Sequence, residues 1–160
     1  MRFRKLTVEE LEQLEKEYIQ FLAANGIPGD EYKKFQLENP EKIDELIEMF
    51  SDIVLEQALK KIKYIEFAEP KELRLFHFQE KNITLIGLQT ESDEIDFTSE
   101  DYFQQLKEVM QSHPESVKIY STYKPINDNR EEELFDYLNQ GASVSSPENY
   151  QFFKTLVPSN

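Results

Sequence analysis

The residues best suited to chemistry are four carboxylates within one short stretch, Glu91, Asp93, Glu94 and Asp96. Carboxylate oxygens are the ligands that hard cations such as Ca²⁺ and Mg²⁺ prefer. We therefore consider a divalent-cation site with Asp93, Glu94 and Asp96 as its ligands. The simpler interpretation is a solvated loop whose acids favour the N-terminus of the following helix through its dipole. A third is a loop that docks a partner protein.

The acidic stretch does not fit the calcium-binding loop of an EF-hand. Counted from Glu94 as the first position, Asp96 and Thr98 fit the third and fifth. The sixth position is Ser99, where the loop needs Gly, and the twelfth is Gln105, where it needs Glu. A divalent ion would relieve the repulsion between the acids, but ion dehydration and loop ordering offset part of this gain. Any cation should therefore bind weakly, with a dissociation constant on the order of 10⁻⁴–10⁻³ M.

His77 is the other residue that could take part in chemistry. It lies in a predicted strand, on the same face as Leu73 and Leu75. This position favours a partly buried, hydrogen-bonded structural histidine. The alternative is a general base or metal ligand that reaches the acidic stretch. The chain has only 2 His, and no zinc motif of the HExxH type occurs in it.

Other catalytic signatures are absent from the sequence. It contains no Cys, which excludes thiolate nucleophiles, disulfides and cysteine-ligated metals. Its 4 Gly do not form a phosphate-binding loop or a dinucleotide-binding fingerprint, and no nucleophile elbow of the G-x-S-x-G type occurs. We therefore identify no catalytic residue and expect no cofactor.

The net charge of −14 limits the possible partners. Acids are densest between residues 91 and 116, and such a surface repels nucleic acids and anionic membranes while attracting basic proteins. A patch of Tyr120, Tyr123 and Lys124 beside Arg74 and Lys118 would suit single-stranded nucleic acid. The overall charge argues against that use. We expect no binding to nucleic acid or membranes.

The compartment is predicted from what the chain lacks. The basic start at residues 1–5 is not followed by the apolar core of a signal peptide. No window approaches the roughly 18 apolar residues of a membrane span. Together with the absence of Cys, this predicts a cytoplasmic protein.

Apolar residues at helical spacing predict helices over the first 61 residues. Thr7 and Glu10 form a capping box, and an apolar face continues to the stop at Gly26 and Pro28. A weaker helical segment covers 30–38. Asn39 caps a long helix over about 40–61. We expect this helix to be central, with Phe50 on its buried face.

The apolar period then changes from helical to alternating. Strands are predicted at 62–67, 73–79, 83–89 and 117–123. Further helices are expected from Thr98 or Ser99 to His113 and from Asp128 to Gly141. A short final element is expected to start between Ser145 and Pro147 and to include Tyr150, Phe153 and Leu156. The strands cluster rather than alternate with helices. We therefore predict an α+β fold in which N-terminal helices pack on a small, mainly antiparallel sheet of about four strands. The prediction is a single domain over 1–160, with a helical part at 1–61 and a sheet with helices at 62–160.

Several short motifs in a fixed order carry a resemblance to a known family. They are 6–11 (LTVEEL), 21–27 (FLAANGI), 50–54 (FSDIV), 86–88 (IGL), 93–97 (DEIDF) and 153–156 (FKTL). Together they resemble an uncharacterised family of small bacterial proteins, over nearly the whole chain. The resemblance implies a single-domain bacterial cytosolic protein and assigns no activity.

The sequence favours a cytosolic, non-enzymatic protein-interaction module that binds another protein or a second copy of itself. The alternative is a divalent-metal-dependent hydrolase that uses the acidic 91–96 loop and His77. An apolar exposed patch would favour the first hypothesis, and a deep polar pocket joining His77 to the acids would favour the second.

Overall fold

The computed structural model describes residues 2–158. The chain divides into two compact units, residues 1–59 and 60–160. This boundary lies within two residues of the division predicted from the change in apolar period. Whether the chain behaves as a single domain stays a prediction.

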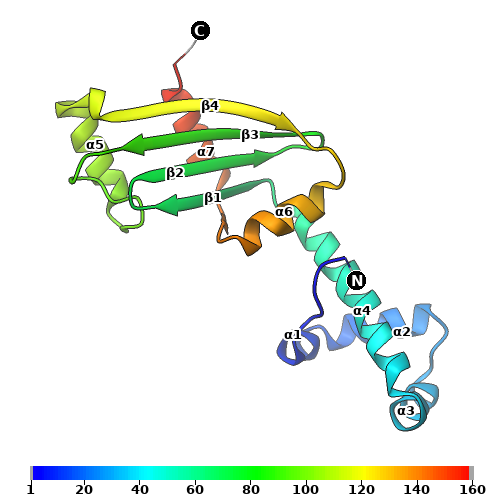
Figure 1. Cartoon of the computed structure of the whole chain (residues 1–160). Helices are drawn as coiled ribbons and strands as arrows, with labels where there is room; N and C mark the ends of the chain where they lie inside the picture. The colour runs from blue at the N-terminus through cyan, green and yellow to red at the C-terminus, as the bar shows by residue number, and fades with distance from the viewer. Residues whose placement is uncertain (1, 159–160) are drawn as a thin grey trace. The chain divides into compact units, whose positions relative to one another are not determined.

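The first unit is helical, and its helices pack around a small apolar core. Leu46 and Phe50 on the long helix are buried together with Leu6 and Leu22, and Phe50 is only 3% exposed, as predicted. The described helices of this unit, shown in Figure 1, are α1 (Val8–Gln13), α2 (Glu15–Ala24), α3 (Gly29–Glu38) and α4 (Pro40–Lys61).

The start of the chain is held against α4 by side chains of that helix. The amides of Arg2 and Phe3 donate to the Asp52 carboxylate, and the amide of Leu6 donates to Ser51 Oγ at 3.0 Å. Ser51 is completely buried. A buried N–H needs a partner, so Ser51 explains how a non-helical segment can lie in this core.

The single helix predicted from Thr7 to Gly26 is two helices. The capping box of Thr7 and Glu10 is present, but Leu14 leaves the helical conformation and separates α1 from α2. The predicted stop is confirmed. Gly26 has a φ of 72°, a conformation that favours glycine, and the amide of Ile27 donates to the carbonyl of Leu22.

The second unit is an antiparallel sheet with helices, which confirms the predicted α+β class. The four predicted strands are present, and the strand order is β4-β3-β2-β1-β5. The strands are β1 (Tyr64–Glu69), β2 (Glu72–Phe78), β3 (Asn82–Thr90), β4 (Val117–Pro125) and β5 (Ser143–Val144). The helices are α5 (Tyr102–Ser112), the short η1 (Pro114–Ser116), α6 (Arg130–Asn139) and α7 (Pro147–Leu156).

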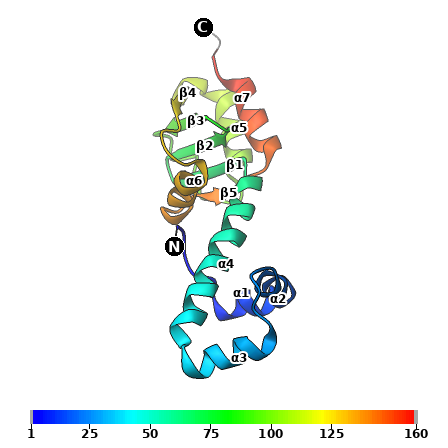
Figure 2. The ribbon, with the colours of Figure 1, turned by 90° about the vertical axis from the view of Figure 1, so that its right-hand side faces the viewer.

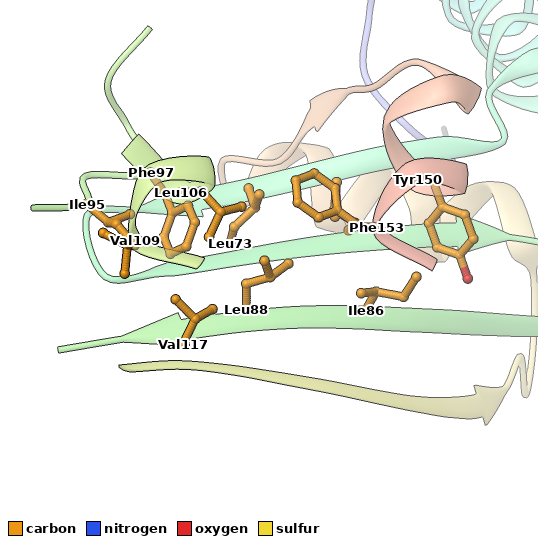
Figure 3. Packing of buried hydrophobic residues seen from close by; sticks show 11 residues of the cluster. Leu73, Ile86, Leu88, Ile95, Phe97, Leu106, Val109, Val117, Tyr150 and Phe153 are labelled. Carbon is orange, nitrogen blue, oxygen red and sulfur yellow. The ribbon is translucent and has the colours of Figure 1, made fainter. Parts of the chain in front are cut away.

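One face of the sheet is covered by α5 and α7, as Figure 2 shows. Alternate residues of β2 and β3 point to this face, and Leu73, Leu75, Ile86 and Leu88 are each 1% exposed or less. Figure 3 shows these strands meeting Leu106, Val109 and Phe153 of the two helices. All residues of this core come from position 64 onward.

Tyr120 lies across Gly87 on the other face of the sheet. The two residues are register partners on β4 and β3, and a Cβ at position 87 would collide with the Tyr120 ring. Nearby, the Arg74 guanidinium lies 4.9 Å from the centre of the Phe67 ring and 3.1 Å from the Glu69 carboxylate. A glycine in mid-strand thus makes room for an aromatic ring of the neighbouring strand.

Two helix starts and one short strand differ from the prediction. β5 was not predicted, because a strand of two residues is too short to show an alternation of apolar and polar residues. Helix α5 starts at Tyr102 instead of at Thr98 or Ser99, because Ser99 forms a turn with Asp101. Helix α6 is capped by Asn129, whose side chain accepts from the amide of Glu132.

Arg130, the first residue of α6, connects this helix to the ends of two strands. Its guanidinium donates to the backbone carbonyls of Phe78 and Gln79 at 3.0 Å each, and to the carbonyl of Ile62. A planar guanidinium with five N–H donors can satisfy several carbonyls at once. Arg130 therefore fixes α6 where β1 begins and β2 ends.

Candidate functional site

The acidic loop is anchored by its two apolar residues. Ile95 is fully buried and Phe97 is 2% exposed, and both belong to the core under α5. The three predicted cation ligands, Asp93, Glu94 and Asp96, are exposed. The loop conformation is therefore fixed by side chains that alternate with the acids, and the acids themselves lie in water.

Lys71, in the turn between β1 and β2, supplies a positive charge to the acidic loop. Its Nζ donates to the carbonyl oxygens of Ser92 at 2.6 Å and Ile95 at 2.9 Å. Carbonyl oxygens of this kind are also common cation ligands. The ammonium group of Lys71 thus lies where it can offset part of the negative charge of the loop.

The Asp96 carboxylate is used within the loop itself. Its Oδ1 accepts from the Thr98 hydroxyl at 2.6 Å and from the Thr98 amide at 2.9 Å. These hydrogen bonds, the one from the hydroxyl first, hold the pKa of the Asp96 carboxyl below its ordinary value. The Asp96 amide donates to Gln105 Oε1, which connects the loop to α5.

His77 is partly buried, as predicted, and its ring lies beside two aromatic rings. Its ring stacks on Tyr64 with centroids 4.4 Å apart and lies 5.4 Å from the ring of Tyr150 on α7. Burial lowers the pKa of the His77 imidazole, and the positive charges of Lys154, Lys63 and Arg130 lower it further. Both effects favour the neutral form of the imidazole.

His77 and the acidic loop lie at opposite ends of β2. The loop follows Thr90, and Gln89 pairs with Glu72 at the start of β2. His77 is five residues further along the strand, which corresponds to roughly 17 Å at the usual rise of a strand. Among residues 2–158, no group of three or more His, Cys, Asp or Glu residues is placed to hold a metal ion. The cation site at Asp93, Glu94 and Asp96 stays a prediction.

Two acids of the loop line a wide groove at this end of the sheet. The groove has a volume of about 1180 Å³, and Glu91 and Glu94 lie in its wall while Asp93 and Asp96 do not. We call it the acidic groove, because glutamates outnumber bases in its wall. Its glutamates are Glu69, Glu72, Glu91, Glu94 and Glu115, and its bases are Lys71, Lys118 and His113.

A second, apolar groove lies between α5 and α7. It has a volume of about 340 Å³ and is lined by Phe103, Leu106, Lys107, Met110, Gln111, Phe152 and Leu156. Phe103 and Phe152 are 44% and 43% exposed, and their ring centroids are 5.2 Å apart. We call this surface the α5/α7 groove. Two neighbouring phenylalanines that remain half in water are typical of a binding surface.

The sequence contains a signal for this groove. Tyr102 and Phe103 are consecutive in α5, and Phe152 and Phe153 are consecutive in α7. Consecutive residues of a helix point about 100° apart, so both members of a pair cannot face the same core. In α7, Phe153 is fully buried and Phe152 lies outside.

Comparison with known proteins gives one match. No curated protein and no solved structure matches this chain. Among the described residues, no helix has the length and apolar character needed to cross a bilayer. One family, described only as a family of unknown function, matches residues 1–158. The chain therefore belongs to the family of unknown function DUF6495.

Proposed function

We propose that this protein is a non-enzymatic interaction module that binds a partner protein in the α5/α7 groove. The observation that supports the proposal is the pair Phe103 and Phe152, half exposed and in contact at the groove. Aromatic residues of this kind dominate binding energy when a partner removes them from water. Among the described phenylalanines, Phe103 and Phe152 are the two that are exposed.

The shape and charge of the groove suit an amphipathic helix from the partner. The groove runs between two helices and offers room for a few apolar side chains, which is how helices dock in grooves. Lys107 is the one charged residue in its wall among those described. The partner helix should therefore carry apolar residues at i, i+4 and i+7 and an acid that can reach Lys107.

A second copy of the chain suits the groove less well. Two copies, each with a net charge of −14, repel one another at low ionic strength. We therefore expect the purified protein to be a monomer at low salt. Sedimentation velocity measures this directly, and a dimer that the groove variants abolish would make a second copy the occupant.

The double variant Phe103→Ser with Phe152→Ser tests the groove. Both side chains are partly exposed, so the fold should persist. Each central aromatic residue of an interface contributes about 2 kcal/mol or more, which predicts a loss of roughly thirtyfold or more in affinity. The probe is a synthetic amphipathic helical peptide with leucines at i, i+4 and i+7, titrated by fluorescence anisotropy.

The control is Val144→Ser, which removes an apolar side chain that is 61% exposed and lies outside the groove. It should bind the peptide as the wild type does. The same three proteins are then used to capture partners from cells, and the dissociation constant of each purified partner is measured. Equal dissociation constants for the wild type and the double variant would show that the α5/α7 groove is not the binding site.

The expected setting is the cytoplasm, and the resemblance to small bacterial proteins suggests a bacterial one. A chain without Cys needs no oxidising compartment to fold. Fractionation of cells that express the tagged full-length protein tests this location.

The hydrolase hypothesis also stays a prediction, and metal titration tests it. It requires a divalent cation on the loop and a role for His77. Calorimetric titration with Ca²⁺, Mg²⁺ and Mn²⁺ should show millimolar binding that the double variant Asp93→Asn with Asp96→Asn abolishes. An absence of heat and of any thermal shift at millimolar metal would remove the main support for this hypothesis.

A further inference from the structure

Strand β4 forms a long open edge of the sheet. It comprises Val117–Pro125 and pairs only with β3, so none of the described residues continues the sheet beyond it. Figure 1 shows β4 along the outer margin of the sheet. The opposite edge is β5, which has only two residues. Natural proteins keep edge strands short, cover them, or protect them with lysine and proline. β4 is neither short nor covered, and its lysines and proline lie near its two ends, which leaves residues 119–123 open.

The register shows which backbone groups of β4 are available. The amide of Ile126 donates to the carbonyl of Lys81, next to the pair of Pro125 and Asn82. Bonded and non-bonded pairs alternate in an antiparallel ladder. Residues 118, 120, 122 and 124 therefore bond to β3. The N–H and C=O groups of Ile119, Ser121 and Tyr123 point away from the sheet.

The other side of β3 agrees with this register. The amide of Thr90 donates to the carbonyl of Lys71, and the amide of Gln79 donates to the carbonyl of Asn82. The even-numbered residues of β3 therefore bond to β2, which leaves its odd-numbered residues for β4. Two independent sets of hydrogen bonds thus give the same open donors and acceptors on β4.

The side chains of β4 indicate the chemistry of a strand that would pair with it. The strand contains two lysines and no acid. Lys118 is exposed, whereas Lys124 already forms an ion pair with Glu133 at 2.6 Å. On the helical face, Ile119 is partly buried against the core and Tyr123 is 72% exposed. A neighbouring strand would therefore meet a positive charge on one face and apolar side chains on the other.

We propose that β4 receives an extended segment of a partner protein, which adds to the sheet as an antiparallel strand and carries an acid beside Lys118 and apolar residues beside Ile119 and Tyr123. Backbone hydrogen bonds supply the affinity in this mode of recognition, and alternate side chains supply the specificity. The surface is distinct from the α5/α7 groove, and the inference does not rest on the function proposed for that groove.

A second copy of the chain is the less suitable occupant. Two β4 strands paired antiparallel over their full length would place Lys118 of each copy opposite Lys124 of the other. Like charges directly opposite one another on neighbouring strands are unfavourable. An acidic segment instead meets Lys118 at a separation well below the screening length of about 8 Å at physiological salt. The glutamates that share the acidic groove with Lys118 weaken this ion pair but leave the backbone hydrogen bonds in place.

The test uses the full-length protein and a synthetic nine-residue peptide of alternating Glu and Val. In the antiparallel arrangement, the backbone N–H and C=O groups of the Val residues bond to those of Ile119, Ser121 and Tyr123. The backbone groups of the Glu residues point away from β4. Two further peptides are N-methylated, one on the Val amides and the other on the Glu amides. We expect binding by fluorescence anisotropy that Val N-methylation weakens about tenfold or more and that Glu N-methylation leaves unchanged.

Amide hydrogen exchange locates the bound peptide. The amides of Ile119, Ser121 and Tyr123 should exchange more slowly when the peptide is present. Lys118→Glu should weaken binding, and a peptide with Lys in place of Glu should bind more weakly to the wild type. The double variant Phe103→Ser with Phe152→Ser should bind the peptide as the wild type does, which separates this test from that of the groove.

Three results would overturn the inference. They are no binding at millimolar peptide, equal effects of the two methylation patterns, and slower exchange at sites outside β4. A dimer of the wild type that Ser121→Pro abolishes would also overturn it, because a second copy would then be the occupant. Ser121→Pro removes an outward N–H and no bond to β3, which is the position where an edge strand tolerates proline.

Discussion

At the scale of single residues, the acidic loop is best understood through a residue outside it. Lys71 donates to two carbonyls of the loop and brings an ammonium group to a segment that is otherwise rich in acids. The carboxylates could be recognised as a cluster from their spacing in the sequence. The lysine was not, because it precedes the carbonyls by 21 and 24 residues and only the β2–β3 hairpin brings it to them.

Replacing Lys71 with Met should destabilise the second unit. The change keeps the apolar stem but removes two hydrogen bonds from a charged donor, each worth about 1.5–3 kcal/mol when buried and less when partly exposed, as here. We expect a loss of about 1–2 kcal/mol in the free energy of unfolding by urea denaturation. Lys71→Arg is the matched control and should lose less. Equal stability of Lys71→Met and the wild type would mean that the loop does not depend on this cation.

His77 should make stability depend on pH in a defined direction. Its pKa is lower in the folded protein than the value of about 6.5 in an unfolded chain. Well above pH 6.5 the imidazole is neutral in both states and favours neither. As the pH falls below 6.5, the unfolded chain takes up the proton first, so stability is lost until the folded pKa is reached.

The groups around His77 explain why the proton is disfavoured. The ring lies between Tyr64 of β1 and Tyr150 of α7, and the nearby charges of Lys154, Lys63 and Arg130 are all positive. Urea denaturation at pH 7.5 and 5.5 should show a smaller loss of stability for His77→Gln than for the wild type.

The matched control for this pH experiment is His113→Gln, at the exposed second histidine. It should lose as much stability between the two pH values as the wild type does. If His77→Gln loses the same amount too, the imidazole is not the group that responds.

At the scale of elements, most of the fold could be predicted from the spacing of apolar residues along the sequence. The strands at 62–67, 73–79, 83–89 and 117–123 are present within a few residues, because their alternation reports the two faces of a sheet. Position-specific features were less predictable. The break at Leu14 interrupts a continuous apolar helix face, and β5 exists only because Ser143 and Val144 reach β1 in the folded chain.

Arg130 is the residue that most clearly connects elements, so its removal should be costly. Arg130→Met leaves the carbonyls of Ile62, Phe78 and Gln79 without this donor. Hydrogen bonds to charged groups are worth about 1.5–3 kcal/mol each, and water can replace some of them. We expect a loss of about 2–4 kcal/mol in the free energy of unfolding, measured by urea denaturation.

The comparison variant is Arg130→Lys, which keeps the charge but loses the planar set of donors. It should lie between the wild type and Arg130→Met. If Arg130→Lys is as stable as the wild type, charge alone is sufficient at this position and the three-carbonyl geometry is not important.

At the scale of the whole molecule, charge is the property that most restricts partners. The chain has 32 Asp and Glu against 18 Lys and Arg, and affinity for nucleic acid normally begins with neutralisation of phosphates by Lys and Arg. We expect no binding to duplex or single-stranded DNA or RNA at physiological salt. A micromolar affinity in fluorescence anisotropy that high salt abolishes would contradict this.

Several basic residues of the sheet lie close together, and such a cluster could favour nucleic acid. Lys118, Lys124 and Tyr120 lie on one face of β4, and Arg74 points to the same face from β2. Arg74 and Lys124 are already paired with Glu69 and Glu133. Of the patch considered from the sequence, Tyr123 lies on the opposite, helical face of the sheet, so only the other four residues share a face. Acids neutralise much of the charge of these four residues.

The contact of Gly87 with Tyr120 has a consequence for sequence variation in this family. Since a side chain at position 87 would occupy the space of the ring, the two positions are not independent. A member of the family with Ala or Ser at the position equivalent to Gly87 should carry a smaller residue than Tyr at the position equivalent to Tyr120. An alignment of the family should therefore show covariation between two residues 33 positions apart in the chain.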